Sequence, residues 1–295
     1  MTILQAIILG IVQGLTEFIP VSSTAHLVFA SRLVGLYNGV EATLKAEQTT
    51  ATMAVIQLGT LLAVLIYFAR DIIDITRAFV SDHLALLRGK KRVDGSKSLS
   101  QAAWLGWLVI IGSIPVAVVG LLLKKQIEGT FTKNLWVIAM MMIVVAVLLA
   151  LAELVGKKER SMEQLGISDA LAVGGAQVLA LIPGSSRSGS TIMGGLFAGL
   201  TRETAARFSF LLSIPAIAAS GLLELKEAIH KLPDGSSLPL IVATIFSGIV
   251  GYASIWFLLK FLRTHSTAVF IVYRLLVGAA ILGALMGGYI SANAR

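Results

Sequence analysis

The sequence has no cysteine and little charge. Of its 295 residues, 14% are charged and 56% are hydrophobic. The absence of Cys excludes disulfides and thiolate metal sites. Several apolar runs of about twenty residues could each cross a hydrocarbon core of roughly 30 Å, so the composition indicates a helical membrane protein. A chain of this length has room for about six to eight spans and for no large soluble domain beside them.

Proline is also rare, and two of the six prolines lie in apolar segments beside paired serines. The segments are Ile19-Pro20-Val21-Ser22-Ser23 and Ile182-Pro183-Gly184-Ser185-Ser186, and each follows a Gln. Proline interrupts a helix because it lacks an N–H and clashes with the preceding turn. We interpret the two segments as copies of one broken element, with a chance likeness among apolar residues as the alternative.

The hydropathy of the chain predicts an all-α, polytopic membrane protein. Six full spans are expected at 51–70, 103–123, 135–155, 207–224, 239–260 and 268–290. The broken segments, at about 3–36 and 168–200, have halves of about a dozen residues, which rise only about 18 Å each. They are too short to cross the membrane and are expected to form two re-entrant helical hairpins.

Basic residues orient the predicted spans. The loop at 71–102 holds Arg77, Arg88, Lys90, Lys91, Arg92 and Lys97, and the loop near 157 holds Lys157, Lys158 and Arg160. Such residues accumulate in cytoplasmic loops, which also accounts for the net charge of +8 without a nucleic-acid partner. Both termini and the first hairpin then lie outside, and the second hairpin enters from inside. Residues 1–295 form a single membrane domain of two inverted repeats, at about 3–155 and 168–290.

Inverted repeats with broken helices place a binding site where the breaks meet. Backbone N–H groups at the start of each second half-helix, together with hydroxyl groups, bind anions. The planar guanidinium of Arg187 suits phosphate oxygens. A kink with a capping serine, and an Arg that reaches the interface, is the alternative. Arg274, near the start of the last span, is compatible with a lipid headgroup contact or with an internal partner.

Gln13 and Glu17 are four residues apart and share one helix face. Glu17 ends its half-helix, where the helix dipole disfavours a carboxylate unless a cation is near. A divalent cation, Mg²⁺ or Ca²⁺, that bridges Glu17 and phosphate would meet this need. A direct ion pair with Arg187 and a protonated Glu17 are the alternatives. His26 is the one His of four in an apolar segment, which favours an acid/base role over a structural one.

These motifs resemble a known family. Gln13-x-x-x-Glu17 with Pro20-Val21-Ser22-Ser23-Thr24-Ala25-His26, and Pro183-Gly184-Ser185-Ser186-Arg187-Ser188, closely resemble the motifs of the bacitracin-resistance type of undecaprenyl-diphosphatase. The likeness covers essentially the whole chain, including Gln57-Leu58-Gly59 and Phe208-Ser209-Phe210-Leu211-Leu212. It implies an inner-membrane enzyme that hydrolyses undecaprenyl diphosphate to undecaprenyl phosphate and phosphate. Such an enzyme recycles the lipid carrier for cell-wall synthesis, gives bacitracin resistance and needs a divalent cation.

The resemblance also implies roles for individual residues. Glu17, Ser23, His26 and Arg187 are expected to be catalytic, with Glu17 also as the metal ligand. The expected substrate contacts are Gln13, Ser22, Thr24, Ser185, Ser186 and Ser188. Gln13 stands where relatives have Glu or Gln, which weakens a mechanism with two carboxylates on the metal. Our hypothesis has Ser23 attack the terminal phosphorus after activation by His26, while attack by His26 or by metal-bound water stays open.

The sequence bears on two other functions. Lipid phosphatases that resemble phosphatidate phosphatase type 2 are excluded, because Met193 stands where that class has a His after its Ser-Arg. A prenyl-phosphate transporter or flippase, alone or combined with the phosphatase, remains the alternative, since transporters use inverted repeats. The expected partners are a polyprenyl diphosphate and membrane lipids, with a homodimer left open. The active site is expected to open to the outer face of a bacterial cytoplasmic membrane.

Overall fold

The computed structural model describes residues 1–88, 99–123, 134–232 and 235–292, with backbone alone at 42, 220 and 222–231. The predicted all-α class is confirmed, since the described part holds helices and no β-strand. The helices are α1 (Ile3–Phe18), α2 (Ser23–Leu33), α3 (Ala42–Tyr67), α4 (Ala69–Leu87), α5 (Gln101–Leu122), α7 (Leu135–Val155), α8 (Ile167–Val178), α9 (Arg187–Phe197), α10 (Arg202–Lys231), α11 (Ser237–Leu262) and α12 (Ala268–Met286), with short 3₁₀ turns η2 (Met162–Gln164) and η3 (Leu179–Leu181).

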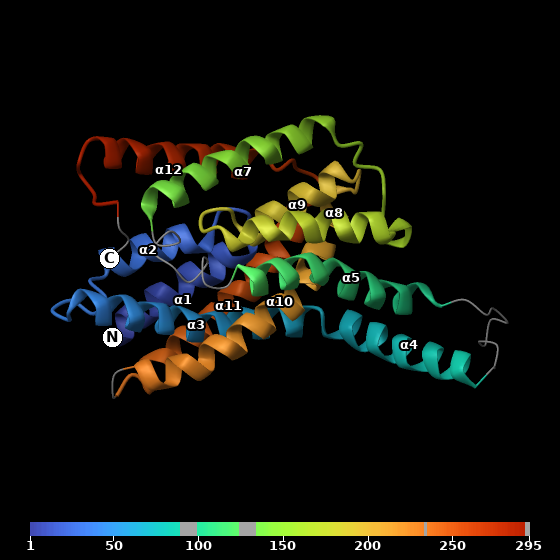
Figure 1. Ribbon diagram of the computed structural model, residues 1–295, viewed down its shortest axis with the longest axis horizontal. Helices are drawn as coiled ribbons and strands as arrows, with labels where there is room; N and C mark the ends of the chain where they lie inside the picture. The colour runs from blue at the N-terminus through green and yellow to red at the C-terminus, as the bar shows by residue number, and fades with distance from the viewer. Residues whose placement is uncertain (89–98, 124–133, 233–234, 293–295) are drawn as a thin grey trace.

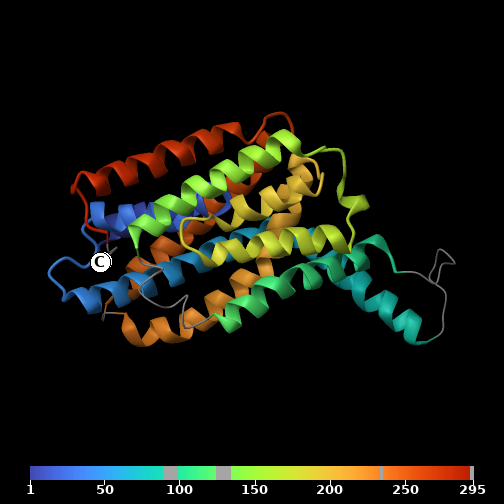
Figure 2. The ribbon, with the colours of Figure 1, turned by 45° about the horizontal axis from the view of Figure 1, so that its top comes forward.

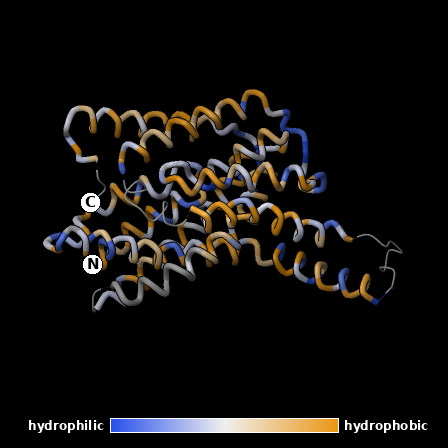
Figure 3. The backbone as a smooth tube through the Cα atoms, viewed as in Figure 1, coloured by the Kyte–Doolittle hydropathy of each residue, from blue (hydrophilic) through white to orange (hydrophobic). Residues whose placement is uncertain are grey.

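Five described helices are long and apolar enough to cross a membrane: α3, α5, α7, α11 and α12. Hydrophobic residues make up most of the helical backbone, and hydrophilic residues gather at several helix ends and connections (Figure 3). Each of the five overlaps a predicted span, and α7 has the predicted limits, whereas α3 begins nine residues before the span predicted at 51–70. The sixth predicted span, 207–224, lies within α10, where part of the side chains falls outside the description. The chain is therefore a multi-pass helical protein.

Both broken segments form helical hairpins. The longest half, α1, has 16 residues and rises about 24 Å, less than the roughly 30 Å of a hydrocarbon core. The side-chain amide of Gln5 donates to Val34 O at 2.8 Å, so the first hairpin begins and ends at the same level. Arg160 does the same for the second hairpin, because it binds Asp169 at 2.6 Å and Ala198 O at 3.2 Å. The two hairpins open toward opposite ends of the molecule (Figures 1 and 2).

The prediction of a loop at 71–102 is wrong for the first half of this range, because helix α4 occupies residues 69–87. In this stretch apolar and charged residues alternate with a helical period, so one face can pack while the other is solvated. Ile72 and Ile75 pack against the core, and the ring of Phe79 lies 5.4 Å from that of Trp107. The period of these apolar residues is the signal that indicates a helix here, whereas the charge of the segment does not reveal it. Lys90, Lys91, Arg92 and Lys97 of the predicted loop lie outside the described residues.

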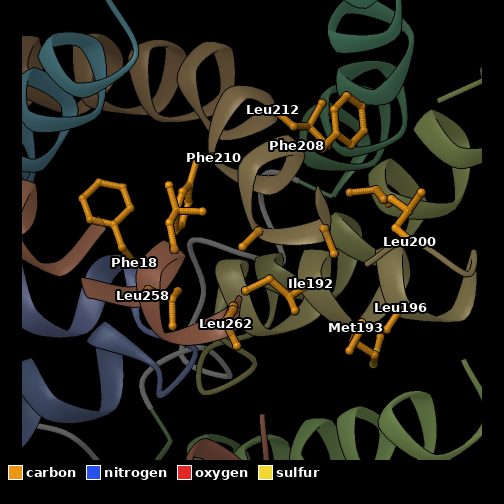
Figure 4. Packing of buried hydrophobic residues seen from close by; sticks show 14 of the residues in the cluster. Phe18, Ile192, Met193, Leu196, Leu200, Phe208, Phe210, Leu212, Leu258 and Leu262 are labelled. Atoms are coloured by element: carbon orange, nitrogen blue, oxygen red, sulfur yellow. The ribbon is translucent and has the colours of Figure 1, made fainter. Parts of the chain in front are cut away.

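The largest buried apolar cluster surrounds the end of α1 and joins it to α9, α10 and α11 (Figure 4). Phe18, the last residue of α1, meets Phe210 edge to face with ring centroids 5.4 Å apart. Along its length α1 lies close to α11, since a Cβ atom on Gly14 would be 2.8 Å from Gly251 N. Small residues at such crossings are typical of membrane helices. This packing fixes the end of α1, where Glu17 lies.

Candidate active site

Each break contains a serine in a strained backbone conformation. Ser22 has φ +77° and precedes α2, and Ser186 has φ +66° and precedes α9. Positive φ is uncommon for residues other than Gly, and its occurrence at equivalent positions of both breaks supports the hypothesis of a functional constraint. An interval of nine residues separates Gln13 from Ser22 and also Gln177 from Ser186. The two segments therefore share a local geometry as well as a sequence.

The structure corrects the register of the two copies. The repeated Ile-Pro-x-Ser-Ser pairs Ser23 with Ser186, whereas the backbone pairs Ser22 with Ser186. Ser23 and Arg187 then correspond, as the first residues of α2 and α9. The cause is one residue fewer before Pro183 and one more after it, with Gly184 at φ +92° in the turn. Gly tolerates this conformation without a steric penalty.

Arg274 of α12 connects the two breaks from within the protein. Its side chain is fully buried, and it donates to Pro20 O at 3.3 Å, to Gly184 O at 3.1 Å and to Ser185 O at 3.0 Å. Broken helices leave backbone carbonyls without partners, which is costly in an apolar environment. Arg274 supplies those partners. Of the two roles predicted for it, contact with a lipid headgroup or with an internal partner, the internal one is therefore confirmed.

Glu17 is the centre of a polar cluster formed by both hairpins. One carboxylate oxygen pairs with Arg187 at 3.0 Å, as one of the alternatives for Glu17 predicted. The other oxygen accepts from Ser23 Oγ at 2.9 Å and from the Gln13 amide at 3.1 Å. The guanidinium of Arg187 also lies over the ring of Phe18, 5.8 Å from its centroid. The Ser23 hydroxyl and the Arg187 guanidinium thus both lie within hydrogen-bond reach of the Glu17 carboxylate.

These residues line a cavity of about 480 Å³ between α1, α2, α3 and the break before α9, which we call the chamber. The predicted site residues that line it are Gln13, Glu17, Ser22, Ser23, Thr24, Ser186 and Arg187. Other parts of the wall are apolar, with Met53, Ile138 and Leu181. A chamber with polar and apolar walls suits an amphiphilic ligand.

Two buried polar atoms of the chamber have no hydrogen-bond partner in the described part of the protein. They are Nη1 of Arg187 and Oε1 of Gln13. Buried polar groups are nearly always paired, so each unpaired one calls for an explanation. A ligand with anionic oxygens would satisfy Arg187.

His26 does not line the chamber. Its Nδ1 lies 2.7 Å from Ser22 O, and its Nε2 lies 2.6 Å from the hydroxyl of Tyr273. Since a carbonyl oxygen only accepts, Nδ1 carries the proton, and Nε2 of the neutral ring accepts from Tyr273. The structure gives the predicted activation of Ser23 by His26 no supporting contact, because the Ser23 hydroxyl donates to Glu17. His26 instead holds the strained peptide that presents Ser23.

The hydroxyls of Ser185 and Ser188 also lie outside the chamber lining. Ser185 donates to Ile182 O at 2.7 Å within its own turn, and Ser188 donates to Ile19 O at 3.3 Å in the other break. Both stabilise the breaks, and the substrate contacts predicted for them have no support here. Sequence reasoning also missed Tyr273, for which no sequence signal existed.

Comparison with known proteins agrees with these motifs. The model of the family described as bacitracin resistance protein BacA matches residues 6–280. An undecaprenyl-diphosphatase of Syntrophobacter fumaroxidans is 52% identical over 282 residues, which are 96% of this chain and 97% of the relative. An undecaprenyl-diphosphatase of Chlorobium phaeobacteroides is 48% identical over 301 residues, which are 99% of this chain and 100% of the relative. The likeness therefore covers both hairpins and all five candidate spans.

Proposed function

The chain belongs to the bacitracin resistance protein BacA family, and we propose that it is an undecaprenyl-diphosphatase whose reaction takes place in the chamber. The names of its relatives favour the phosphatase over the transporter or flippase. The activity would return the lipid carrier to cell-wall synthesis and lower the amount of bacitracin's target. The single observation that carries the proposed site is the contact of Ser23 with Glu17, which is itself paired with Arg187.

In the proposed reaction Ser23 is the nucleophile and Glu17 is the base. The proton of the Ser23 hydroxyl passes to Glu17 Oε2, 2.9 Å away, as Oγ bonds to the terminal phosphorus. The bond from that phosphorus to the bridging oxygen breaks, and undecaprenyl phosphate leaves with the electron pair. Water then hydrolyses the phosphoserine to inorganic phosphate and restores the Ser23 hydroxyl. Attack by a water molecule on the diphosphate is the competing route.

Arg187 and the two helix starts would hold the phosphates. The unpaired Nη1 of Arg187 can bind a phosphate oxygen while Nη2 keeps its bond to Glu17. The first N–H groups of a helix have no partner within that helix. At α9 the N–H of Gly189 already donates to Ser186 Oγ at 3.2 Å, which leaves those of Arg187 and Ser188, whereas α2 has no side-chain cap. Ser22 and Ser186, which precede the two helices, line the chamber. Charge that develops on the transferred phosphoryl group would thus meet prearranged donors.

The residues fit a divalent cation only together with phosphate. In the described part of the chain no three His, Cys, Asp or Glu side chains gather into a metal site. Mg²⁺, however, is usually held by one or two carboxylates with waters and substrate phosphates. Glu17 and the unpaired Oε1 of Gln13 would hold such a cation. When bound, it would neutralise part of the diphosphate charge.

The proposal includes a finer topology. We place α10 as the sixth span, the two hairpins as re-entrant elements of inverted repeats, and residues 1–295 in a single membrane domain. The opposed hairpins support this, as does the basic stretch of Lys157, Lys158 and Arg160, which lies between α7 and α8 where the second hairpin opens. That basic end would face the cytoplasm, so the termini and the chamber would face outward. A homodimer stays a prediction, to be decided by light scattering.

The test is phosphate release by the purified chain from a prenyl diphosphate in detergent with Mg²⁺. Hydrolysis needs no second compartment, so detergent separates an enzyme from a pure carrier. With isotope-labelled terminal phosphate and a rapid quench, the wild type should form a labelled protein that Ser23→Ala does not form. A well-folded chain that releases no phosphate would end the phosphatase assignment. Normal turnover by Ser23→Ala would exclude the serine route.

A further inference from the structure

Helix α4 carries large apolar side chains on an exposed side. They are Ile73, Val80, Leu84 and Leu87, with 45%, 51%, 44% and 84% of full exposure. Spacings of seven, four and three residues place all four along one face of the helix, and we call this row the exposed stripe. Contiguous apolar surface of this kind usually marks a contact with a membrane or with another protein.

A different side of α4 attaches the helix to the protein. Ile72 and Ile75 pack against the main apolar core, and the ring of Phe79 lies 5.4 Å from that of Trp107 in α5. The indole N–H of Trp107 also donates to Nε2 of His83 at 3.1 Å. The position of α4 is therefore fixed by this side, and the exposed stripe is not needed to hold it.

Arginines border the exposed stripe. The three are Arg70, Arg77 and Arg88, which directly follows α4; all are exposed, and each lies three or four residues from a member of the stripe. Residues at this spacing are neighbours on a helix surface. Asp74 is the one exposed carboxylate of α4, so the exposed surface carries a net positive charge beside apolar side chains. This combination is typical of helices that bind the surface of a membrane.

The surroundings of α4 indicate its level relative to the membrane. The helix begins two residues after Tyr67, where the candidate span α3 ends. It packs beside Trp107 in the second turn of α5, and Trp is enriched where spans meet the membrane surface. Asp71 and Arg207, paired at 2.8 Å beside the first turn of α4, mark the edge of the apolar region. The exposed stripe therefore lies at the level of lipid headgroups, at the end of the molecule where the second hairpin opens (Figure 1).

We propose that the exposed stripe and the arginines beside it bind anionic phospholipid. The apolar side chains contact the upper parts of the acyl chains, and the guanidinium groups bind the phosphate oxygens. Each basic residue close to a membrane surface favours anionic over neutral lipid, because only the anionic lipid has a charge left to balance it. This binding is separate from the proposed reaction, since among the described residues none of α4 lines the chamber.

A second copy of the chain is the competing occupant of this surface. A twofold contact buries the same surface of both copies. Pairing through the exposed stripe would therefore bring the arginines of one copy against those of the other, and like charges in contact repel. The opposite charge of lipid phosphates favours lipid as the occupant.

The absence of Cys allows a single labelled position to report on the exposed stripe. The full chain with Val80→Cys is labelled with a bimane fluorophore and placed in vesicles of phosphatidylcholine and phosphatidylglycerol. Acyl chains with a nitroxide near the headgroup quench the label on contact, and one of the two lipids at a time carries them, in equal amounts. We expect the nitroxide on phosphatidylglycerol to quench more strongly than the nitroxide on phosphatidylcholine. Because both leaflets have the same composition, the result does not depend on which end of the protein faces the cytoplasm.

Ser81→Cys is the matched control position. Ser81 is also exposed, but it lies about 100° further round α4 than Val80, away from the exposed stripe. A label there should be quenched less by either lipid.

The role of charge is tested by removing the arginines from the labelled Val80→Cys chain. Arg70→Gln and Arg77→Gln should each lower the preference for phosphatidylglycerol, by up to about fivefold, and Arg77→Lys should retain it. Lys157→Gln is the matched control, because it removes an exposed positive charge after α7 and should leave the preference unchanged.

Three results would overturn the proposal. Equal quenching by the two lipids would mean that the surface contacts lipid without recognising charge, and no quenching by either would favour a protein partner. An unchanged preference in a well-folded Arg70→Gln or Arg77→Gln would remove the role of the arginines. If one of these variants no longer elutes as a single species, the other decides. The quenching needs no turnover, so an inactive wild type would contradict the proposed phosphatase alone.

Discussion

Arg274 donates a hydrogen bond to the backbone carbonyl of Pro20 at 3.3 Å, and so links the last span to the break in the first hairpin. The same guanidinium binds Gly184 O and Ser185 O in the second break. The proposed reaction centre therefore depends on a residue that does not itself line the chamber but binds the backbone of Gly184, which does. Its position explains how two interrupted helices can end within an apolar environment.

Arg274→Lys should lower both stability and activity. A Lys side chain has one nitrogen and cannot reach carbonyls on α7 and on both breaks, which Arg274 does through three nitrogens. Hydrogen bonds to charged groups contribute about 1.5–3 kcal/mol each, so we expect a loss of at least that size and a clearly lower Tm. Arg263→Lys, at an exposed position, is the control. An unchanged Tm for Arg274→Lys would contradict the linking role.

Glu17→Gln should remove the proposed general base for Ser23 while it keeps the size of the side chain. We expect kcat to fall by about 10²–10⁴ and no labelled phosphoenzyme to form, because the Ser23 proton has no acceptor of sufficient basicity. The loss of the ion pair with Arg187 should also raise KM. Glu163→Gln, on an exposed carboxylate, should match the wild type. Normal kcat for Glu17→Gln would refute the assigned base.

His26→Asn separates a positioning role from an acid/base role. If His26 only holds Ser22 O through Nδ1–H, an amide donor should replace it in part, and the pH profile of kcat should keep its shape. Tyr273→Phe removes the partner of Nε2 and should lower kcat only a few-fold. A base would instead cost about 10²–10⁴ in kcat and flatten the acid limb of the profile. Steady-state rates from pH 5 to 9 decide between the two.

Apolar length and proline position were sufficient to predict most of the helices. The limits of α7 were predicted to the residue, and both hairpins lie where Pro20 and Pro183 interrupt the apolar runs. The α4 helix was not predicted, because the charged residues of this segment indicate a loop, whereas the helical period of its apolar residues indicates a helix. Long-range convergence of Glu17 with Arg187 followed from the repeat, since equivalent breaks in opposed repeats must approach each other.

Side-chain direction at the breaks could not be predicted from spacing. Ser22 has a positive φ where α2 begins, and on this helix His26 faces Tyr273 whereas Ser23 and Thr24 line the chamber. The second break differs by one residue because Gly184 adopts a conformation that the sequence pattern does not reveal. Arg274 carried a signal, as a lone Arg in an apolar span, but its partners are backbone atoms that no sequence motif records.

Gly184→Ala should disrupt the backbone geometry of the second break. At Gly184 the backbone has φ +92°, and an added Cβ would overlap the backbone of Ile138. Both the strain and the overlap would displace Ser186 and Arg187, so we expect a lower Tm and a kcat reduced at least tenfold. Gly175→Ala in the same hairpin is the control, since nothing lies within 4 Å of its Cβ and it lies inside α8. There Ala should stabilise the helix by up to about 1 kcal/mol. The two substitutions add the same methyl group nine residues apart. Equal effects on Tm and kcat would show that the break tolerates a side chain at Gly184. They would also show that the geometry of the break does not position Arg187.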